Sequence, residues 1–423
     1  HVNLYVLVIL SIVLLFPVRL FGVTLFNEPI MIIALLASIF YILAIQSFDQ
    51  ISLKIFLSSV LVSALFLLTL LTSMNLNDVI FKDFAEVFKP VLYGLIFVFG
   101  FSAASFISER AVVHTIVILS LVSILFSFLI YFEFAYPLVD LYKGRPSYAS
   151  WNLHFFRFSG TLGYPGIFSY WIVLYLIILL SPVTRSLSSR KLMIFLYSVG
   201  ITGLILTGSR GGLIVALSTY LLIFIFFGNK RIIWRSFFWG LLFMFLVVTY
   251  ATFFSNNHTD LVPLEYLQNG FADIKASSAS HRINELILLK ESLATATFLG
   301  IGPSNFYISS TYGPVESTYF YYGVKFGLVG VFYYFSMVFL VACAFVREYK
   351  LHRLSTASLF FLWALVCMVL GSLNESVTEE YKSFFLFFFL IGLFYKINRS
   401  GLSSVGPANI RKVQSDSLSL RSK

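Results

Sequence analysis

The sequence predicts an all-α, polytopic integral membrane protein, and two observations carry this prediction. Of its 423 residues, 59% are hydrophobic and only 11% are charged. Because soluble domains carry about 25% charged residues, this chain cannot cover a water-facing surface of ordinary size. Apolar runs of about 18 residues or more also recur along it, which is the pattern of membrane-spanning helices. No charged or Pro/Gly-rich linker divides the chain, so 1–397 are predicted to form one membrane domain.

About twelve transmembrane helices are predicted, each from one apolar run. Their expected positions are 3–16, 29–46, 52–73, 90–107, 112–133, 165–181, 191–207, 211–228, 233–254, 317–345, 354–371 and 383–397. Two connections are much longer than the others, at about 134–164 and 255–316, and loops of that length in a compact fold are generally functional. The Ser-rich segment 398–423 is predicted to be a disordered cytoplasmic tail.

The distribution of Lys and Arg predicts the orientation of these helices. If the N-terminus lies in the cytoplasm, short inside loops and the tail hold most of the basic residues, whereas the outside loops hold most of the acidic ones. Both long loops are therefore expected outside the cytoplasmic membrane. The formal net charge of +10 follows from this asymmetry, so the lipid bilayer is an expected partner and nucleic acid is not.

Neither a metal nor a cofactor is predicted. Cys343 and Cys367 fall inside apolar segments, and no Cys-x-x-Cys, His-Glu-x-x-His, P-loop or Gly-x-Ser-x-Gly motif is present. Asp-x-Asp is absent as well, and the first outer loop, about 17–28, offers only Glu28. These absences argue against a metal-dependent sugar transferase of the dolichol type.

The most informative polar segment is the predicted outer hairpin 207–212, which reads Thr-Gly-Ser-Arg-Gly-Gly. A helix is predicted to begin at Gly211 and to run inward, so its free N–H groups face the outer surface, where glycines let an anion approach closely. Arg210 adds a guanidinium group suited to phosphate. Ser209, Arg210 and Gly211 are therefore candidate anion-binding residues. The alternative is that Ser209 only caps the helix and Arg210 only reaches lipid headgroups.

A second segment of the same character closes the first long loop. It runs from Arg157 through Gly160 and Gly163 to Pro165, and proline is favoured at the first position of a helix. Again a cation and glycines precede an outward-facing helix N-terminus, so Arg157 is a candidate phosphate ligand. The alternative is a flexible loop end with an arginine at the membrane interface.

The second long loop is predicted to contain an amphipathic helix over 281–296, lying on the outer surface or over a cavity. Its apolar residues recur at helical spacing, at Ile283, Leu286, Ile287 and Leu293. His281 and Arg282 open the helix as candidate substrate-binding residues, and a Gly-rich turn that includes Asn305 follows it. For Arg282, a solvated helix start is the alternative.

A carboxylate precedes the next predicted span. Glu316 is a candidate general base, although the helix dipole would also stabilise it there as a cap. Lys325 lies deeper in the same run and out of phase with Glu316, so it needs a cavity or a partner within the bundle. Tyr319 and its aromatic neighbours are typical of a membrane-interface belt, and tyrosines also stack on sugars.

The order of these elements resembles the O-antigen polymerase/ligase superfamily, the Wzy and WaaL proteins of bacterial surface polysaccharide assembly. Its members have a similar number of helices, a Ser-Arg-Gly hairpin, and a large outer loop with an Arg, a Gly-x-Gly-Pro-x-Asn-Phe-like turn and a His-Asn pair before a Gly-x-x-Gly. The matching elements here are Arg157–Gly160, Ser209–Gly211, Arg282, Gly300–Phe306, Glu316–Ser317 and Gly327–Gly330. The departure is Glu316–Ser317 in place of His-Asn, which favours the polymerases, because the ligases depend on that His.

The resemblance implies a GT-C-like fold and a metal-independent, inverting glycosyl transfer. Undecaprenyl-diphosphate-linked oligosaccharide repeats, as donor and acceptor, would be polymerised into O-antigen or a related polysaccharide at the outer face of the bacterial cytoplasmic (inner) membrane, with a Wzz-like chain-length regulator as a further partner. In this hypothesis Arg210 and Arg282 clamp the diphosphate with help from Arg157. Glu316 accepts the proton of the attacking hydroxyl. The remaining predicted substrate-binding residues are Ser209, Gly211, His281, Asn305, Tyr319 and Lys325.

Two alternatives stay open at this point. A ligase would perform the same chemistry with a lipid A-core sugar as acceptor. A polysaccharide flippase or transporter belongs to a different class, and it should show a pseudo-repeat between its halves and charges at mid-membrane depth. The sequence shows no convincing repeat, and its suspicious charges cluster at the outer ends of the predicted spans.

Overall fold

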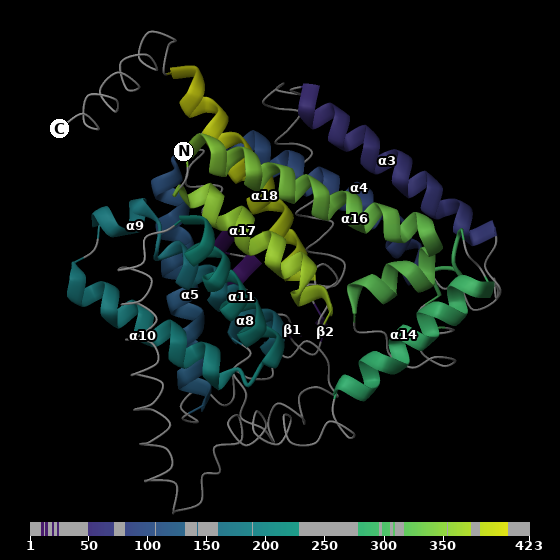
Figure 1. The fold of residues 1–423 in the computed structure, drawn as a ribbon, viewed down its shortest axis with the longest axis horizontal. Helices are drawn as coiled ribbons and strands as arrows, with labels where there is room; N and C mark the ends of the chain where they lie inside the picture. Colours follow the sequence, from purple (N-terminus) through teal and green to yellow (C-terminus); the bar gives the residue numbers. More distant parts are fainter. Residues whose placement is uncertain are drawn as a thin grey trace, which may run out of the picture.

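The protein is described from a computed structural model. It covers residues 10–11, 13–15, 19–20, 23–24, 50–71, 81–105, 107–131, 142, 160–187, 189–227, 278–295, 298–304, 308, 317–352, 354–373 and 381–404. The α-helices are α3 (Gln50–Leu71), α4 (Phe81–Ala103), α5 (Glu109–Tyr131), α8 (Pro165–Ile178), α9 (Pro182–Leu187), α10 (Arg190–Leu206), α11 (Arg210–Phe227), α14 (Ser278–Thr295), α16 (Thr318–His352), α17 (Thr356–Val369) and α18 (Tyr381–Ser404) (Figure 1). Two 3-10 helices, η3 (Gly160–Leu162) and η4 (Gly371–Leu373), and a two-residue antiparallel pair, β1 (Arg19–Leu20) with β2 (Val23–Thr24), complete the described elements.

The described part of the chain is an α-helical membrane protein, as predicted. Six of its helices are long and apolar enough to cross a bilayer: α3, α4, α5, α11, α16 and α17. The apolar helix α8 and the apolar part of α18, Ser383–Ile397, are shorter. The predicted spans 29–46 and 233–254 and most of 3–16 lie outside the described residues, so the total of twelve stays a prediction.

One end of the bundle gathers segments that are far apart in the sequence. Ser169 near the start of α8 faces Gly212 near the start of α11. The hydroxyl of Tyr170 in α8 donates to the carbonyl of Gly371, just after α17, at 3.1 Å. The hydroxyl of Ser317 before α16 donates to the carbonyl of Ser372 at 3.0 Å. We call this end, formed by the N-terminal ends of α4, α8, α11 and α16 and the C-terminal end of α17, the hairpin end.

The opposite end is formed by the C-terminal ends of α4, α11, α16 and α18. There the rings of Phe226 and Phe345 lie 5.4 Å apart, and the Lys396 ammonium lies 4.6 Å from the centre of the Phe101 ring. We call it the basic end because the predicted inside Lys and Arg residues of the described helices lie on it. Those whose side chains the structure describes are Lys54, Arg110, Arg185, Arg190, Lys191, Arg347, Lys350 and Lys396. The relative direction of the described helices therefore agrees with the predicted alternation.

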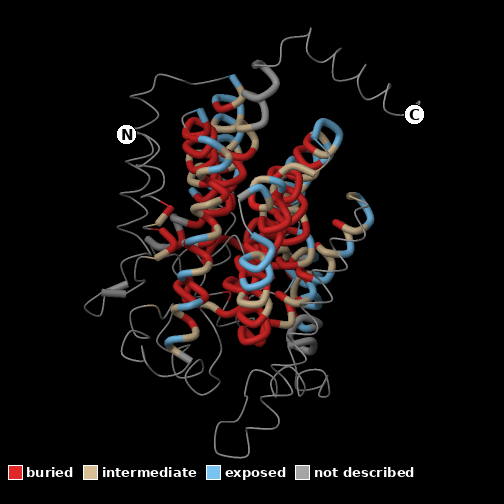
Figure 2. Tube along the Cα trace, turned by 90° about the vertical axis from the view of Figure 1, so that its left-hand side faces the viewer, coloured by how far each residue is buried: buried red, intermediate tan, exposed pale blue. Residues whose placement is uncertain are grey.

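Buried residues run along the helices of the bundle (Figure 2). Among them, α4 and α18 make an extensive contact. Their backbones approach closely at two glycines: a side chain at Gly100 would collide with the Phe389 carbonyl, and one at Gly392 would collide with the Phe97 carbonyl. Because small residues are what allow helices to pack this closely in a membrane, these glycines fix the α4–α18 interface.

Two helix boundaries differ from the prediction. The span expected to begin at 90 begins at Phe81, so Glu86 and Lys89 belong to a helix and not to a loop. Pro90 does not prevent this, although it removes one backbone donor. At the other end of the chain the predicted span 383–397 belongs to α18, which continues to Ser404. The boundaries of α8, α10 and α11 agree with the predicted spans within a few residues.

The span predicted over 317–345 is corrected, because α16 is not one straight helix. Gly327 has φ 58° and ψ −145°, which is outside the helical region and is accessible mainly to glycine. The rings of Tyr319 and Phe335 lie 5.8 Å apart, whereas a continuous helix would separate the two residues by about 24 Å. The chain therefore reverses at Gly327 between a short arm, 318–326, and a long arm, 328–352 (Figure 1). Only the long arm has the length of a span.

Candidate functional site

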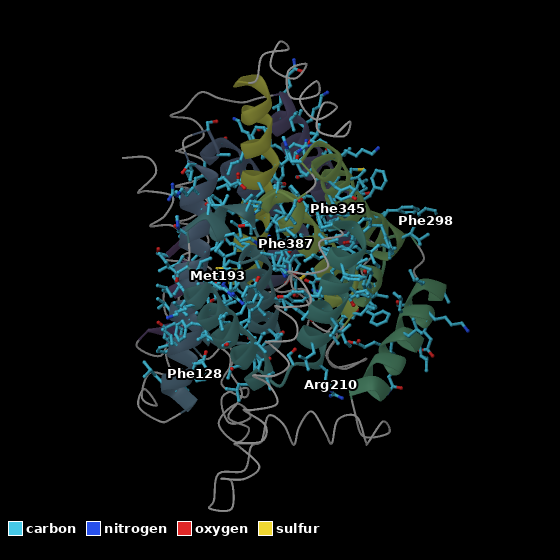
Figure 3. The ribbon with its side chains drawn as sticks, turned by 60° about the vertical axis from the view of Figure 1, so that its left-hand side comes forward. Phe128, Met193, Arg210, Phe298, Phe345 and Phe387 are labelled. Atoms are coloured by element: carbon cyan, nitrogen blue, oxygen red, sulfur yellow. The ribbon has the colours of Figure 1, made fainter. Side chains whose placement is uncertain are left out.

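The turn that joins α10 to α11 lies at the hairpin end. Figure 3 shows Arg210 at the edge of the bundle, far from Phe345, which lies at the basic end. Gly208 makes the turn with φ 59°. The hydroxyl of Ser209 accepts the N–H of Gly212 at 3.1 Å, so α11 begins at Arg210, one residue before the predicted start. The cap offered as an alternative is thus present, and half-buried Arg210 opens the helix. Of the four N–H groups that such an end leaves without a partner in its own helix, that of Gly212 is satisfied by this cap, and that of Ser209 donates to the Thr207 hydroxyl at 3.2 Å.

The glycines of this hairpin serve packing. Gly211 and Gly212 are both buried. A side chain at Gly212 would collide with Ser169 of α8. The close approach predicted for an anion is therefore made, at Gly212, by a neighbouring helix, and this ties the start of α11 to the start of α8.

The second predicted segment is described from Gly160 onward, and Arg157 lies outside the described residues. Gly160 has φ 56° and faces the ring of Phe168, where a side chain would collide. The N–H of Thr161 donates to the Ser123 hydroxyl at 3.1 Å, which binds η3 to α5. Pro165 occupies the first turn of α8, as predicted. This loop end is therefore folded tightly onto the bundle at the hairpin end.

The predicted amphipathic helix is present as α14, which begins at Ser278 and packs on α16. His281 and Arg282 lie in its first turns, and their side chains are outside the described set. The buried face is mixed: Glu285 and Ser292 are each only 2% exposed, and Leu289 on the same face packs against Ile301, Ile308 and Val324. By contrast, Leu286 is 57% and Ile287 49% exposed. The apolar stripe read from the sequence is thus partly an outer face.

Glu285 is buried because it meets the start of α16. One of its carboxylate oxygens, Oε1, accepts the N–H of Ser317 at 3.4 Å, which is a long hydrogen bond. A carboxylate at this position satisfies a free amide and is favoured by the helix dipole. Glu316, the predicted base, lies outside the described residues, so the described carboxylate at this helix start comes from α14. The sequence reasoning missed Glu285, although its position one turn after Arg282 on the same helix face was a usable signal.

Tyr319 joins the short arm of α16 to α17. Its hydroxyl lies 3.0 Å from the carbonyl of Met368 and 2.9 Å from that of Val369, so it donates to the last turn of α17. Tyr334 in the long arm donates to the same Met368 carbonyl at 2.8 Å. These contacts supply donors to carbonyls that a helix end leaves free, and they explain Tyr319 as a residue that fixes the site's architecture.

Two glycine motifs of the sequence interlock beside this arm. Gly300 and Gly302 have φ 70° and 102°. The N–H of Ile301 donates to the Val324 carbonyl at 3.0 Å, and the N–H of Gly302 donates to the Lys325 carbonyl at 3.1 Å. The Gly-rich turn therefore caps the C-terminal end of the short arm. Asn305, the candidate ligand in this turn, lies outside the described residues.

Lys325 has the partner within the bundle that its depth required. It is 1% exposed, and its ammonium lies 3.8 Å from Glu86 Oε2 and 4.0 Å from the centre of the Tyr321 ring. Lys89 Nζ lies 2.6 Å from the same Glu86 oxygen and donates to the Tyr321 hydroxyl at 3.1 Å. We call Glu86, Lys89, Tyr321 and Lys325 the buried ionic cluster. The sequence reasoning placed Glu86 and Lys89 in a loop; their spacing of three residues before an apolar run was the missed signal.

The described contacts therefore connect the predicted motifs at one end of the bundle. They run from η3 through α8 to the α10–α11 hairpin, and from α8 through η4 to the start of α16, α14 and the Gly-rich turn. Within the described ranges, no three or more His, Cys, Asp or Glu side chains gather as they would around a metal ion. The fold and this gathering define an α-helical membrane protein with one polar, motif-bearing end.

No protein-family model matches the chain, and a comparison with curated proteins finds no match either. The functional interpretation therefore depends on the residues and contacts described above.

Proposed function

We propose that this protein is a glycosyltransferase that polymerises undecaprenyl-diphosphate-linked oligosaccharide repeats into a surface polysaccharide. The observation that carries the proposal is the meeting, at the hairpin end, of segments from 160–164, 207–212, 278–302 and 317–330. Residues that act on one substrate must share one site, and these segments come together from distant parts of the chain.

The same geometry supports an outer active site. The predicted inside Lys and Arg residues of the described helices lie together at the basic end, and positively charged loops favour the cytoplasmic side of a bacterial membrane. The hairpin end then faces the opposite side, where lipid-linked repeats are polymerised in the proposed reaction. The long arm of α16 connects the two ends.

The proposed reaction needs charge stabilisation more than covalent catalysis. The hydroxyl oxygen of the acceptor sugar forms a bond to the anomeric carbon of the donor, while the bond from that carbon to the diphosphate oxygen breaks. Arg210 and Arg282, assisted by Arg157, stabilise the charge that develops on the departing diphosphate. A carboxylate accepts the proton of the attacking hydroxyl; Glu316 is the predicted group, and Glu285 is a second carboxylate at the same helix start. Attack opposite the leaving group inverts the anomeric centre.

Cells that depend on this protein for surface polysaccharide provide the test. Arg210→Ala, Arg282→Ala and Glu316→Gln should each abolish or shorten the polysaccharide ladder on a gel at matched protein levels. The control is Arg190→Ala, since Arg190 is an exposed arginine at the opposite end of α10. Wild-type ladders in all three site variants would refute the mechanism. Full-length polymer that is no longer attached to its acceptor would favour a ligase instead.

One observation favours a second candidate function, transport of a lipid-linked saccharide. Transporters commonly bind substrate at interrupted helices near intramembrane charges, and α16 is interrupted at Gly327, two residues after the buried Lys325. The two functions are separated by purified protein in detergent, where no compartments exist: a polymerase lengthens lipid-linked repeats there, whereas a transporter leaves them unchanged.

A further inference from the structure

The short arm of α16 begins at the hairpin end, so the contacts that hold the arm in place also position the start of α16 within the candidate site. Four groups of contacts hold it among the described residues, one of them aromatic, since the ring of Phe66 in α3 stacks on that of Phe326 in the arm at 3.9 Å. Its first residues contact α14 and the end of α17 through Ser317 and Tyr319, and its last carbonyls are capped by the Gly-rich turn. Its side toward α4 is held by the buried ionic cluster.

The buried ionic cluster joins the two helices through charge. Glu86 and Lys89 lie in the first part of α4, and Tyr321 and Lys325 lie in the short arm. The Glu86 carboxylate lies between the two ammonium groups, at 2.6 Å from Lys89 and 3.8 Å from Lys325. Both ammonium groups also face the Tyr321 ring, at 5.0 and 4.0 Å from its centre. Inside a membrane protein such groups are costly unless they pair, so pairing constrains the arm's position.

Burial argues against direct contact between these lysines and a substrate. Lys325 is 1% and Lys89 is 6% exposed, whereas a lysine that binds a diphosphate must present its ammonium group to it. The predicted role of Lys325 as a substrate-binding residue is therefore better replaced by a role that acts through the arm.

We propose that Glu86, Lys89 and Lys325 are positioning residues, which lock the short arm of α16 against α4 and thereby hold the start of α16 in place beside Glu285. This proposal rests on the proposed function for its kinetic consequence, but the locking itself does not. When the lock is broken, the arm shifts while the arginines of the α10–α11 hairpin keep their places. Turnover then falls because the groups at the start of α16 are misplaced, and the affinity for the lipid-linked substrate is retained.

The first test measures the lock without using activity. Thr318 is fully buried in the short arm, so Thr318→Cys, in a protein with Cys343→Ala and Cys367→Ala, reports the arm's exposure to a water-soluble maleimide. Lys325→Met and Glu86→Gln should each accelerate labelling at least about tenfold. The exchange Glu86→Lys with Lys325→Glu keeps two ammonium groups and one carboxylate in the cluster, and it should slow labelling again. The control is Lys290→Met, an exposed lysine of α14, which should change nothing.

The second test uses the same variants, with Thr318 and both cysteines intact, in purified polymerisation assays. Lys325→Met should lower kcat about 10- to 100-fold with little change in KM, and the exchanged pair should recover part of the loss. A raised KM with unchanged kcat would mean that Lys325 contacts substrate, and it would overturn the proposal. Equal labelling rates in all variants would overturn it as well. If the labelling responds as expected but wild-type protein forms no polymer, the lock stands and the proposed function fails.

Discussion

Gly300 and Gly327 lie back to back where the Gly-rich turn meets the break in α16. A side chain added to Gly300 would lie 2.5 Å from the Gly327 nitrogen, and one added to Gly327 would lie 2.5 Å from the Gly300 nitrogen. Both residues also have positive φ, at 70° and 58°. Two motifs that the sequence separates by many residues therefore form one contact, which allows the chain to reverse and places the short arm.

This contact predicts that Gly300→Ala and Gly327→Ala each lower the free energy of unfolding by about 1–3 kcal/mol, through backbone strain and collision. The double variant should lose less than the sum, because either substitution alone opens the same contact. Melting of the detergent-solubilised protein measures both effects. The control is Gly203→Ala, whose added methyl group would meet a side-chain atom of Ile124 at 3.1 Å within a helix of ordinary geometry. Equal losses at all three positions would contradict the contact's importance.

The buried ionic cluster predicts an asymmetry between its two charges. Glu86→Gln leaves the ammonium groups of Lys89 and Lys325 buried without their shared carboxylate, so it should cost about 3–5 kcal/mol. Lys325→Met should cost less, since Glu86 keeps Lys89 at 2.6 Å. The melting temperatures of the two purified variants test this order. The reverse order would show that the long Glu86–Lys325 contact contributes more to stability than the short Glu86–Lys89 contact.

Glu285 should have a role in folding that can be separated from its charge. Glu285→Gln keeps an oxygen that accepts the Ser317 N–H, so the melting temperature should stay close to that of the wild type. Glu285→Ala leaves that amide without the acceptor and should cost about 1 kcal/mol. Glu291→Ala, at an exposed position of the same helix, is the control and should be neutral. A large loss in Glu285→Gln would show that the charge itself stabilises the start of α16.

The exposed apolar residues of α14 predict contact with lipid. Leu286 is 57% exposed, and in a membrane protein an outward apolar stripe on an amphipathic helix faces the bilayer interface. A nitroxide attached at Leu286→Cys in liposomes should collide more often with oxygen than with a water-soluble nickel complex. At Glu291→Cys, an exposed polar position of the same helix, the preference should reverse. The same preference at both positions would place α14 entirely in water or entirely in lipid.

The parts of this fold that follow from local pattern were predictable. Long apolar runs located α3, α5 and α11 within a few residues, and proline and serine marked the starts of α8 and α11. The break at Gly327 was not predictable, because the apolar run continues through it and the Gly-x-x-Gly motif also occurs in straight packed helices. Its reversal depends on the turn at Gly300, which only tertiary structure brings close.

The site was predictable in part for the same reason. A buried lysine in an apolar run requires a partner, so the sequence predicts that Lys325 has one. That this partner is Glu86 depends on how α4 and the short arm pack. Glu285 was missed because hydrophobic spacing suggested that the apolar side of α14 would be buried. The structure buries the face that holds Glu285, Leu289 and Ser292, and the carboxylate on this face meets a helix start.

The central claim is that the hairpin end transfers glycosyl units, and purified protein with lipid-linked repeats tests it most directly. Chain length of the product, resolved on a gel over time, should increase with the wild type and with Arg190→Ala. With Arg210→Ala the rate should fall by about two to three orders of magnitude, as expected when a group that stabilises transition-state charge is removed. Undiminished chain growth by Arg210→Ala, or no growth with the wild type, would contradict the account.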